Sequence, residues 1–246
     1  MKNLVAADVL EIWERGLNQS LLHRTLIMLG AALPELSLDD IACLSIGKRD
    51  DYLMLLREHL FGPVLINTAV CPACLERMEW ENQVSDLRVP APAESIDGDV
   101  HQLHLENFDL EFRLPNSADL ASLGALGNTE PAVHHLLRRC VTGLKIQGVD
   151  SDIEELPQHV LDALSVRIER LDPQAEVRLE LDCPHCQHNW TVLFDVASFL
   201  WTEINDWAER TLKTVHTLAR AYCWSEQEIL RLSPVRRQLY LGLLCS

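Results

Sequence analysis

Apolar residues near the start of the chain recur at the spacing of amphipathic helices. Between Val5 and Leu33 they fall three and four positions apart, and Gly16 interrupts the pattern once. Because an α-helix has 3.6 residues per turn, this pattern predicts two helices that separate at Gly16. A later helical stretch ends at Gly62, where glycine favours termination. Region 1–63 is therefore expected to be mostly helical.

The other end of the chain carries a second long helical pattern. Its apolar seam recurs every three to four positions and comprises Leu200, Ile204, Trp207, Thr211, Val215, Leu218 and Tyr222. Two shorter helices should follow, with Ser225 and Ser233 as their N-caps, because serine accepts a hydrogen bond from the first helical turn. Region 198–246 is therefore expected to be helical as well.

Two segments between these ends alternate apolar and polar residues with the period of a β-strand. In region 64–87, "VLINTAV" and "RMEWENQV" flank a C-P-x-C motif, and in region 177–197 "VRLELD" and "NWTVLFDV" flank a second one. Alternation with period two is typical of half-buried strands. Each motif is therefore predicted to form the tip of a β-hairpin.

Region 88–176 separates the two hairpins and combines a linker with helices and strands. Residues 88–100 are rich in proline and loop-forming residues, so we expect a linker there. A hairpin should turn at Glu106 and Asn107, and helical spacing predicts helices over 117–126, 131–144 and 156–172. This region is expected to be an α/β insertion.

The two C-P-x-C motifs are a repeat in register. Cys71 and Cys74 align with Cys183 and Cys186 at a constant offset of 112 positions. Two residues between cysteines allow both thiolates to face one ion, and Zn²⁺ prefers four such ligands in a tetrahedron. Each hairpin supplies only two, so we expect one shared zinc site. Two separate metal or redox pairs, or four free thiols, are the alternatives.

A shared site would define the fold class and limit the chemistry. The fold is then α+β, mostly helical, with a split four-cysteine zinc ribbon made of two β-hairpin knuckles and an inserted middle α/β region. Four cysteine ligands leave no open position for a reactive water, so the zinc would be structural. We therefore expect no enzyme, and no spacing indicates a catalytic triad or a nucleotide site.

Composition narrows the remaining classes of function. The formal net charge is −16, which disfavours general binding to the phosphate backbone of nucleic acids. No apolar run reaches the roughly 20 residues that cross a bilayer, and the N-terminus does not fit a signal peptide. A cytoplasmic protein with reduced thiols is expected.

Two further groups contain residue types that can bind metals. They are His134, His135 and Cys140, and His101 with His104. We interpret both groups as ordinary surface or core residues rather than metal ligands.

Several motifs together are characteristic of one family. In chain order they are "IWERGL", "SIGKRDDYLMLLREHLFGPVL", "CPAC", "LEFRLPNSADLASL", "LLRRCV", "CPHC", "FDVASFLWTEINDWA" and "HTLARAYCWSEQEILRLSPVRRQLYLGLL". With this set the chain resembles the baseplate hub assembly chaperones of contractile-tailed phages and of phage tail-like contractile injection systems. The resemblance covers almost all of residues 8–244.

The resemblance implies a function based on protein binding. It predicts an assembly chaperone that transiently binds hub or wedge proteins of a contractile particle, with no small-molecule substrate. It also places paired cysteines at the four zinc-site positions and suggests Arg236, Arg237 and Tyr240 as partner contacts. A permanent baseplate component, and a zinc-ribbon regulatory binding protein, are the alternatives.

Overall fold

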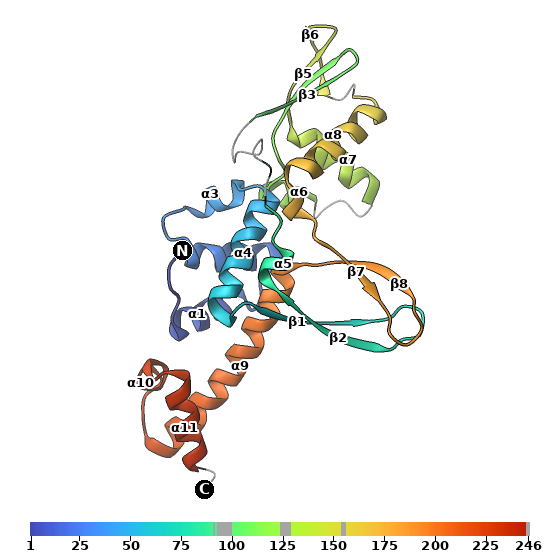
Figure 1. Cartoon of the computed structure of the whole chain (residues 1–246). Coiled ribbons are helices and arrows are strands. Elements are labelled where there is room, and N and C mark those ends of the chain that lie inside the picture. The colour runs from blue at the N-terminus through green and yellow to red at the C-terminus, as the bar shows by residue number, and fades with distance from the viewer. Residues whose placement is uncertain (91, 93–99, 124–128, 154–155, 245–246) are drawn as a thin grey trace. The chain divides into compact units, whose positions relative to one another are not determined.

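The structure, a computed structural model, describes residues 1–90, 92, 100–123, 129–153 and 156–244, and only the backbone of residues 129–131 (Figure 1). It confirms the α+β class. The chain forms two compact units, one of Met1–Glu35 with Val196–Ser246 and one of Leu36–Asp195. Most of the predicted linker, and Cys245, lie outside the described residues. None of the described helices has the length and apolar character of a membrane span.

The first unit is a helical assembly built from both ends of the chain. Its elements are α1 (Ala6–Gly16), α2 (Leu21–Ala32), α9 (Val196–Tyr222), α10 (Glu226–Arg231) and α11 (Pro234–Leu244). Helix α9 contacts each of the other four, so it is the central element of this unit. The predicted seam of α9 is confirmed, since Leu200, Ile204 and Leu218 are fully buried.

Gly16 permits close packing of the first unit as well as ending α1. A Cβ atom at this position would lie 2.4 Å from the Trp201 ring, so no larger residue fits without movement. Arg24 lies over the same ring, 4.3 Å from its centroid, and its Nε donates to the Gly16 carbonyl at 2.8 Å. The indole N–H of Trp13 donates to Asn205 on α9 at 2.9 Å. These contacts fix α1 and α2 against α9.

The second unit contains all the strands of the described residues. Its helical elements are α3 (Leu38–Cys43), α4 (Ile46–Phe61), α5 (Val84–Leu87), α6 (Ser117–Leu123), α7 (Thr129–Cys140), α8 (Gln158–Leu171) and the 3-10 helix η2 (Pro173–Ala175). Its strands are β1 (Val64–Val70), β2 (Arg77–Gln83), β3 (His101–Leu105), β4 (Phe108–Phe112), β5 (Val141–Ile146), β6 (Val149–Asp150), β7 (Arg178–Asp182) and β8 (Asn189–Leu193). They form the β1–β2 hairpin, the β7–β8 hairpin and an antiparallel sheet of order β3-β4-β5-β6.

The inserted middle region has its own core between the four-stranded sheet and two helices. Leu110 and Phe112 of β4 pack with Leu137 of α7 and with Val160 and Leu164 of α8. The hairpin predicted at Glu106 and Asn107 is confirmed as β3–β4. Because one face of the sheet is covered by these helices, the region can fold around an interior of its own.

The helix predicted over residues 131–144 is wrong in its last turn. Helix α7 ends at Cys140, and Val141 begins strand β5. Strand β5 then turns at Gln147 and Gly148, which both have positive φ, into β6. The "QG" pair is a turn signal that helical spacing alone did not reveal, because paired positive φ values are what a tight hairpin requires.

Asp172 connects α4 to the segment that leads into β7. Its carboxylate accepts hydrogen bonds from the Ser45 hydroxyl at 3.1 Å and from the Gly47 backbone N–H at 2.8 Å. A Cβ atom on Gly47 would lie 2.2 Å from the same carboxylate, so this approach needs glycine. Negative charge at the N-terminus of α4 is also favoured by the helix dipole.

Candidate metal centre

The two C-P-x-C motifs form equivalent turns at the tips of the two hairpins. We call β1–β2 with its turn the first knuckle hairpin and β7–β8 with its turn the second. Each turn comprises six residues, 71–76 and 183–188, between the last strand pairs. In the first, the Leu75 N–H donates to the Cys71 carbonyl at 2.9 Å, and in the second the Gln187 N–H donates to the Cys183 carbonyl at 2.9 Å. The repeat in the sequence is therefore a repeat in backbone structure.

A residue with positive φ follows each second cysteine. Leu75 has φ 62° and Gln187 has φ 60°. Glycine adopts this left-handed conformation most easily, and a side chain there costs about 1–2 kcal/mol. Both turns therefore adopt the same left-handed conformation without a glycine.

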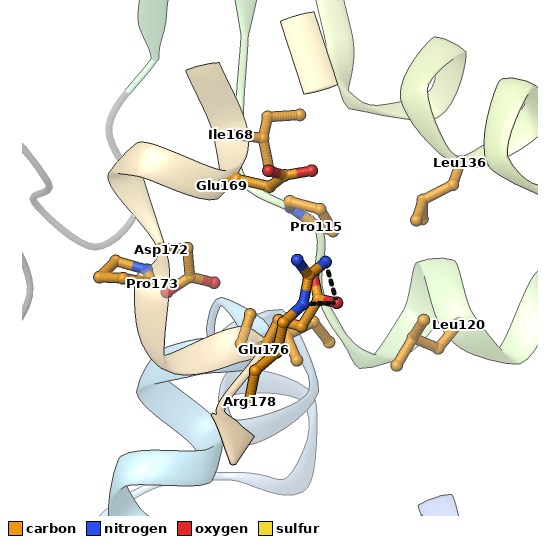
Figure 2. Close-up of a pocket in the computed structure, with 11 residues that line it drawn as sticks. Pro115, Leu120, Leu136, Ile168, Glu169, Asp172, Pro173, Glu176 and Arg178 are labelled. Atoms are coloured by element: carbon orange, nitrogen blue, oxygen red, sulfur yellow. Dashed lines mark hydrogen bonds and ion pairs between the residues drawn. The ribbon is translucent and has the colours of Figure 1, made fainter. Parts of the chain in front are cut away.

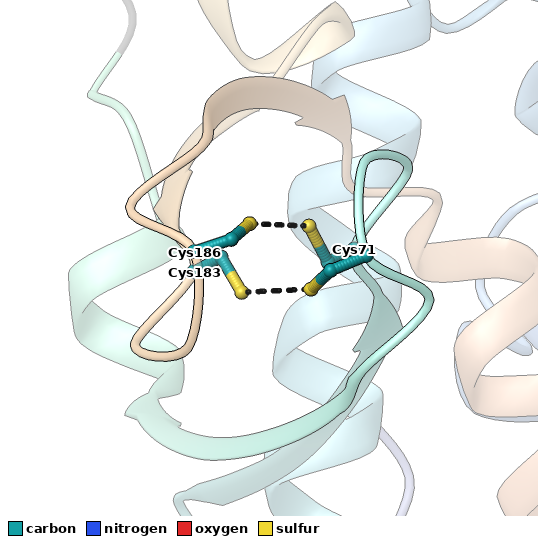
Figure 3. Close-up of side chains that lie close together, drawn as sticks. Cys71, Cys183 and Cys186 are labelled. Carbon is teal, nitrogen blue, oxygen red and sulfur yellow. Dashed lines mark hydrogen bonds between the residues drawn. The ribbon is translucent and has the colours of Figure 1, made fainter.

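The four cysteine sulfurs converge between the two turns, as Figure 3 shows. Cys71 Sγ lies 3.6 Å from Cys186 Sγ, and Cys74 Sγ lies 3.6 Å from Cys183 Sγ. All four sulfurs lie within 4.8 Å of one another. Each close pair joins the first cysteine of one hairpin to the second cysteine of the other. The arrangement therefore has approximate two-fold symmetry.

This geometry fits a tetrahedral metal ion. Four sulfurs at the Zn–S distance of about 2.3 Å would lie roughly 3.8 Å apart, close to the separation of the two near pairs. The backbone hydrogen bonds place both thiols of each turn on the same side, toward the other hairpin. The four cysteines could hold Zn²⁺ or another ion that prefers thiolates. Among the described residues they are the one group of three or more side chains with this capacity.

The surroundings of Cys71 and Cys74 shift the pKa values of these two thiols in opposite directions. Burial raises the pKa of Cys71, but hydrogen bonds from the backbone N–H groups of Cys74 and Ala73 outweigh burial and bring that pKa to about 7. The Glu76 N–H favours the thiolate of Cys74, but burial and the neighbouring thiols raise the pKa of Cys74 to about 12. Without a cation, one thiol therefore ionises easily and its neighbour keeps its proton. A divalent cation would replace such protons.

Gln174, which the sequence analysis did not identify, joins the two halves of the ribbon at their base. It lies in η2, directly before β7, and is 6% exposed. Its side-chain oxygen accepts from the Val89 N–H at 2.5 Å, and its side-chain nitrogen donates to the Leu87 carbonyl at 3.3 Å. Arg88 between them forms a bidentate ion pair with Asp51 of α4. No spacing rule predicts such a contact between distant segments.

The other histidine and cysteine groups are dispersed in the fold. His104 is exposed and lies 2.7 Å from Asp109, whereas His101 is buried beside Phe112. Cys140 is buried, and burial raises its pKa to about 12. In the described part of the chain, none of these groups brings three potential metal ligands together.

The three residues suggested as partner contacts occupy different environments on α11. Arg236 is exposed. Arg237 is only 7% exposed, and this burial lowers the pKa of its guanidinium. The Tyr240 ring lies 4.9 Å from Trp224 and 5.6 Å from Tyr222, measured between centroids, in edge-on geometry. Of the three, Arg236 is the one whose side chain is mainly in solvent.

A pocket of about 460 Å³ lies beside α8 and η2 (Figure 2). Apolar side chains, including Leu120, Leu136 and Ile168, form much of its wall. Arg178 at its edge forms an ion pair with Glu176, with the closest approach at 2.6 Å. Sequence reasoning did not indicate this pocket, because its lining comes from four separate stretches of the chain.

A family model described as T4 bacteriophage base plate protein matches residues 33–201. The matched segment contains both knuckle hairpins, the middle region and the start of α9. Neither a curated protein nor a solved structure matches the chain.

Proposed function

The chain belongs to the family of T4 bacteriophage base plate proteins, and on this premise we propose that it is an assembly chaperone for the baseplate hub of a contractile, phage tail-like particle. It binds other baseplate proteins, those of the hub or wedge, and releases them as assembly proceeds. The family match is the observation that carries the baseplate role in this proposal. The order of motifs through to the last helix supports the more specific chaperone role.

The proposed role depends on binding and needs no catalytic turnover. We propose that Cys71, Cys74, Cys183 and Cys186 hold one Zn²⁺ ion, and that this ion is structural. Four thiolates would complete its coordination and leave no position for substrate or reactive water. Its contribution would be to fix the two knuckle hairpins against each other, so that the second unit keeps a constant shape. Assembly would take place in the cytoplasm.

A permanent structural role is the second candidate. The family description favours this role, since the description names the baseplate itself. The two roles differ in where the protein is found after assembly. A chaperone would be absent from mature particles, and cells without it would accumulate unassembled hub proteins. A structural component would be present at a fixed copy number in every particle.

Quantitative mass spectrometry of purified particles distinguishes these roles. We expect fewer than one copy of the chain per baseplate in particles from wild-type cells, and few complete baseplates in cells from which its gene is deleted. A whole-number copy per baseplate would overturn the chaperone proposal in favour of a component. Normal assembly without the gene would contradict both.

A further inference from the structure

The last helix, α11, exposes a row of large apolar side chains. Val235, Leu239 and Leu243 are 70%, 65% and 67% exposed. They are four positions apart, so they lie along one face of the helix. Single exposed apolar residues are common on protein surfaces, but an aligned row indicates a surface that another molecule covers.

This row is not the face by which α11 packs in its own unit. That face is provided by Tyr240 and Leu241, which pack against the buried cluster of Val215, Leu218 and Ile229. The buried Arg237 lies on the same side of the helix as Leu241. The helix is therefore apolar on two sides, and its internal contacts use one of them.

Helix α11 carries charge of the opposite sign to that of the chain as a whole. It contains two arginines and no acidic residue, whereas the complete chain has 21 basic and 37 acidic residues. Arg236, which follows Val235 in the sequence, is exposed. Complementary potentials favour a partner with acidic residues around its own apolar site.

We infer that the Val235–Leu239–Leu243 face of α11 docks into an apolar groove, rimmed by aspartate or glutamate, on another protein of the baseplate. This inference rests on the proposed function and names the surface that performs it. A second copy of the chain that pairs through this same face is a poorer occupant. In such a pair, Arg236 of one copy would lie near Arg236 of the other, and the two positive charges would repel. A face of three side chains is also far smaller than the 20–30 residues per partner of stable interfaces, and suits a transient complex.

The position of α11 relative to the family match is consistent with a role in partner choice. The match ends at residue 201, early in α9, so α10 and α11 lie beyond the matched segment. The metal centre and middle region lie within it. The sequence of such a surface can differ between proteins that serve different particles, while the segment that the family model matches stays the same.

The test uses the full-length chain and each baseplate protein encoded with it, produced singly. Binding is measured by calorimetry for the wild type, for Leu239→Glu, and for Val149→Glu as the matched control. Val149 is 66% exposed but lies in β6 of the other unit. We expect Leu239→Glu to weaken binding by roughly tenfold or more, because it places a charge at the centre of the apolar face. Val149→Glu should bind like the wild type.

The outcomes separate this inference from the proposed function. If the wild type binds a baseplate protein and Leu239→Glu binds it equally well, the surface is wrongly assigned and the function stands. If the wild type binds none of them, the proposed function fails. If light scattering shows that the wild type is a dimer and Leu239→Glu a monomer, the occupant is a second copy and the inference is overturned. Unchanged circular dichroism of the variant ensures that lost binding is not unfolding.

An electrostatic variant tests the acidic rim separately. Arg236→Glu should slow association by several fold at low salt, and the difference from the wild type should shrink as salt is added. Faster association of Arg236→Glu would show that the partner's rim is basic and would contradict the inferred partner chemistry.

Discussion

The two knuckle hairpins have the same turn but differ in what supports their strands. In the first hairpin, Leu65 and Asn67 are buried, and α5 follows with Val84 and Leu87 also buried. In the strands of the second, only Leu181 is buried. Packing along the strands therefore stabilises the first hairpin. The second hairpin depends more on contacts at its cysteine turn and at its base. Turns of the same structure can thus rest on supports of unequal strength.

The polar contacts of the first hairpin are also more buried than those of the second. In the first hairpin, Asn82 accepts hydrogen bonds from the Trp80 indole at 2.8 Å and from the Asn67 amide at 3.1 Å, on the partly buried face. In the second, Asn189 donates to Asp182 at 3.0 Å in an exposed position. Buried hydrogen bonds contribute more because leaving one partner unsatisfied is costly. We therefore expect the second hairpin to respond most to loss of the metal.

The largest effect should come from removing a metal ligand. Cys71→Ser and Cys183→Ser should each lose the entire equivalent of bound zinc, because a structural site needs all four ligands and contributes about 10 kcal/mol or more of apparent binding free energy in small zinc modules. Elemental analysis measures the zinc. If one variant retains a full equivalent, the two pairs do not share a site.

The variants Cys71→Ser and Cys183→Ser also test whether the two hairpins differ in stability. Hydrogen exchange should accelerate strongly in β7–β8 of either variant, whereas amides of β1–β2 should keep most of their protection. Cys43→Ser, at an exposed cysteine outside the quartet, is the matched control and should change neither zinc nor exchange. Equal loss of protection in both hairpins would show that packing does not distinguish them.

The next largest effect should follow from breaking the joint at the base. Gln174→Ala leaves the Val89 N–H without its acceptor, and a buried unsatisfied donor costs about 1–3 kcal/mol. We expect a decrease of that size in the free energy of unfolding, measured by denaturant titration. Gln158→Ala, at an exposed glutamine, should change it by less than about 0.5 kcal/mol. A similar small change for Gln174→Ala would mean that the base does not help to hold the second hairpin.

Substitution of the asparagines compares the strands directly. Asn82→Ala removes the acceptor of two hydrogen bonds in the first hairpin, so we expect a loss of about 1–2 kcal/mol. Asn189→Ala in the second removes one exposed hydrogen bond and should cost less than about 0.5 kcal/mol. Thermal unfolding of the zinc-bound proteins provides the measurement. The reverse order would contradict the view that the first hairpin has the stronger internal support.

A small gain in stability is expected at the turns, where the hairpins are alike. Leu75→Gly and Gln187→Gly should each stabilise the protein by about 0.5–1 kcal/mol, because glycine removes the cost of positive φ but loses more chain entropy on folding. The two increments, read from denaturant midpoints, should be equal within error. Unequal increments would show that the turns themselves differ and would weaken the comparison based on strands.

The features that local sequence predicts well are those with a local physical cause. The hairpins around Cys71 and Cys183 follow from alternation and from the C-P-x-C spacing, and the end of α4 follows from Gly62. Strand β5 was missed because the helical pattern before it continues past Cys140. A periodic pattern shows where a helix can form but contains no signal for the strand partner that ends it.

The missed parts of the site depend on contacts between distant segments. Gln174 lies 85 positions from Val89, and neither residue belongs to a recognisable motif. On α11, spacing alone could not show which of two apolar sides is buried, so Arg237 was grouped with the exposed Arg236. The tertiary structure, rather than propensity, determines both outcomes.

The separation of the two cysteine pairs along the chain has a consequence for biosynthesis. Cys74 precedes Cys183 by 109 positions. At the translation rates of about 5–20 residues per second, the first pair leaves the ribosome roughly 5–20 s before the second. During this interval the nascent chain has only two of the four thiols of the candidate metal centre, while the middle region can already form its core. Coordination of one metal ion by all four thiols is thus possible only after the second pair has been synthesised.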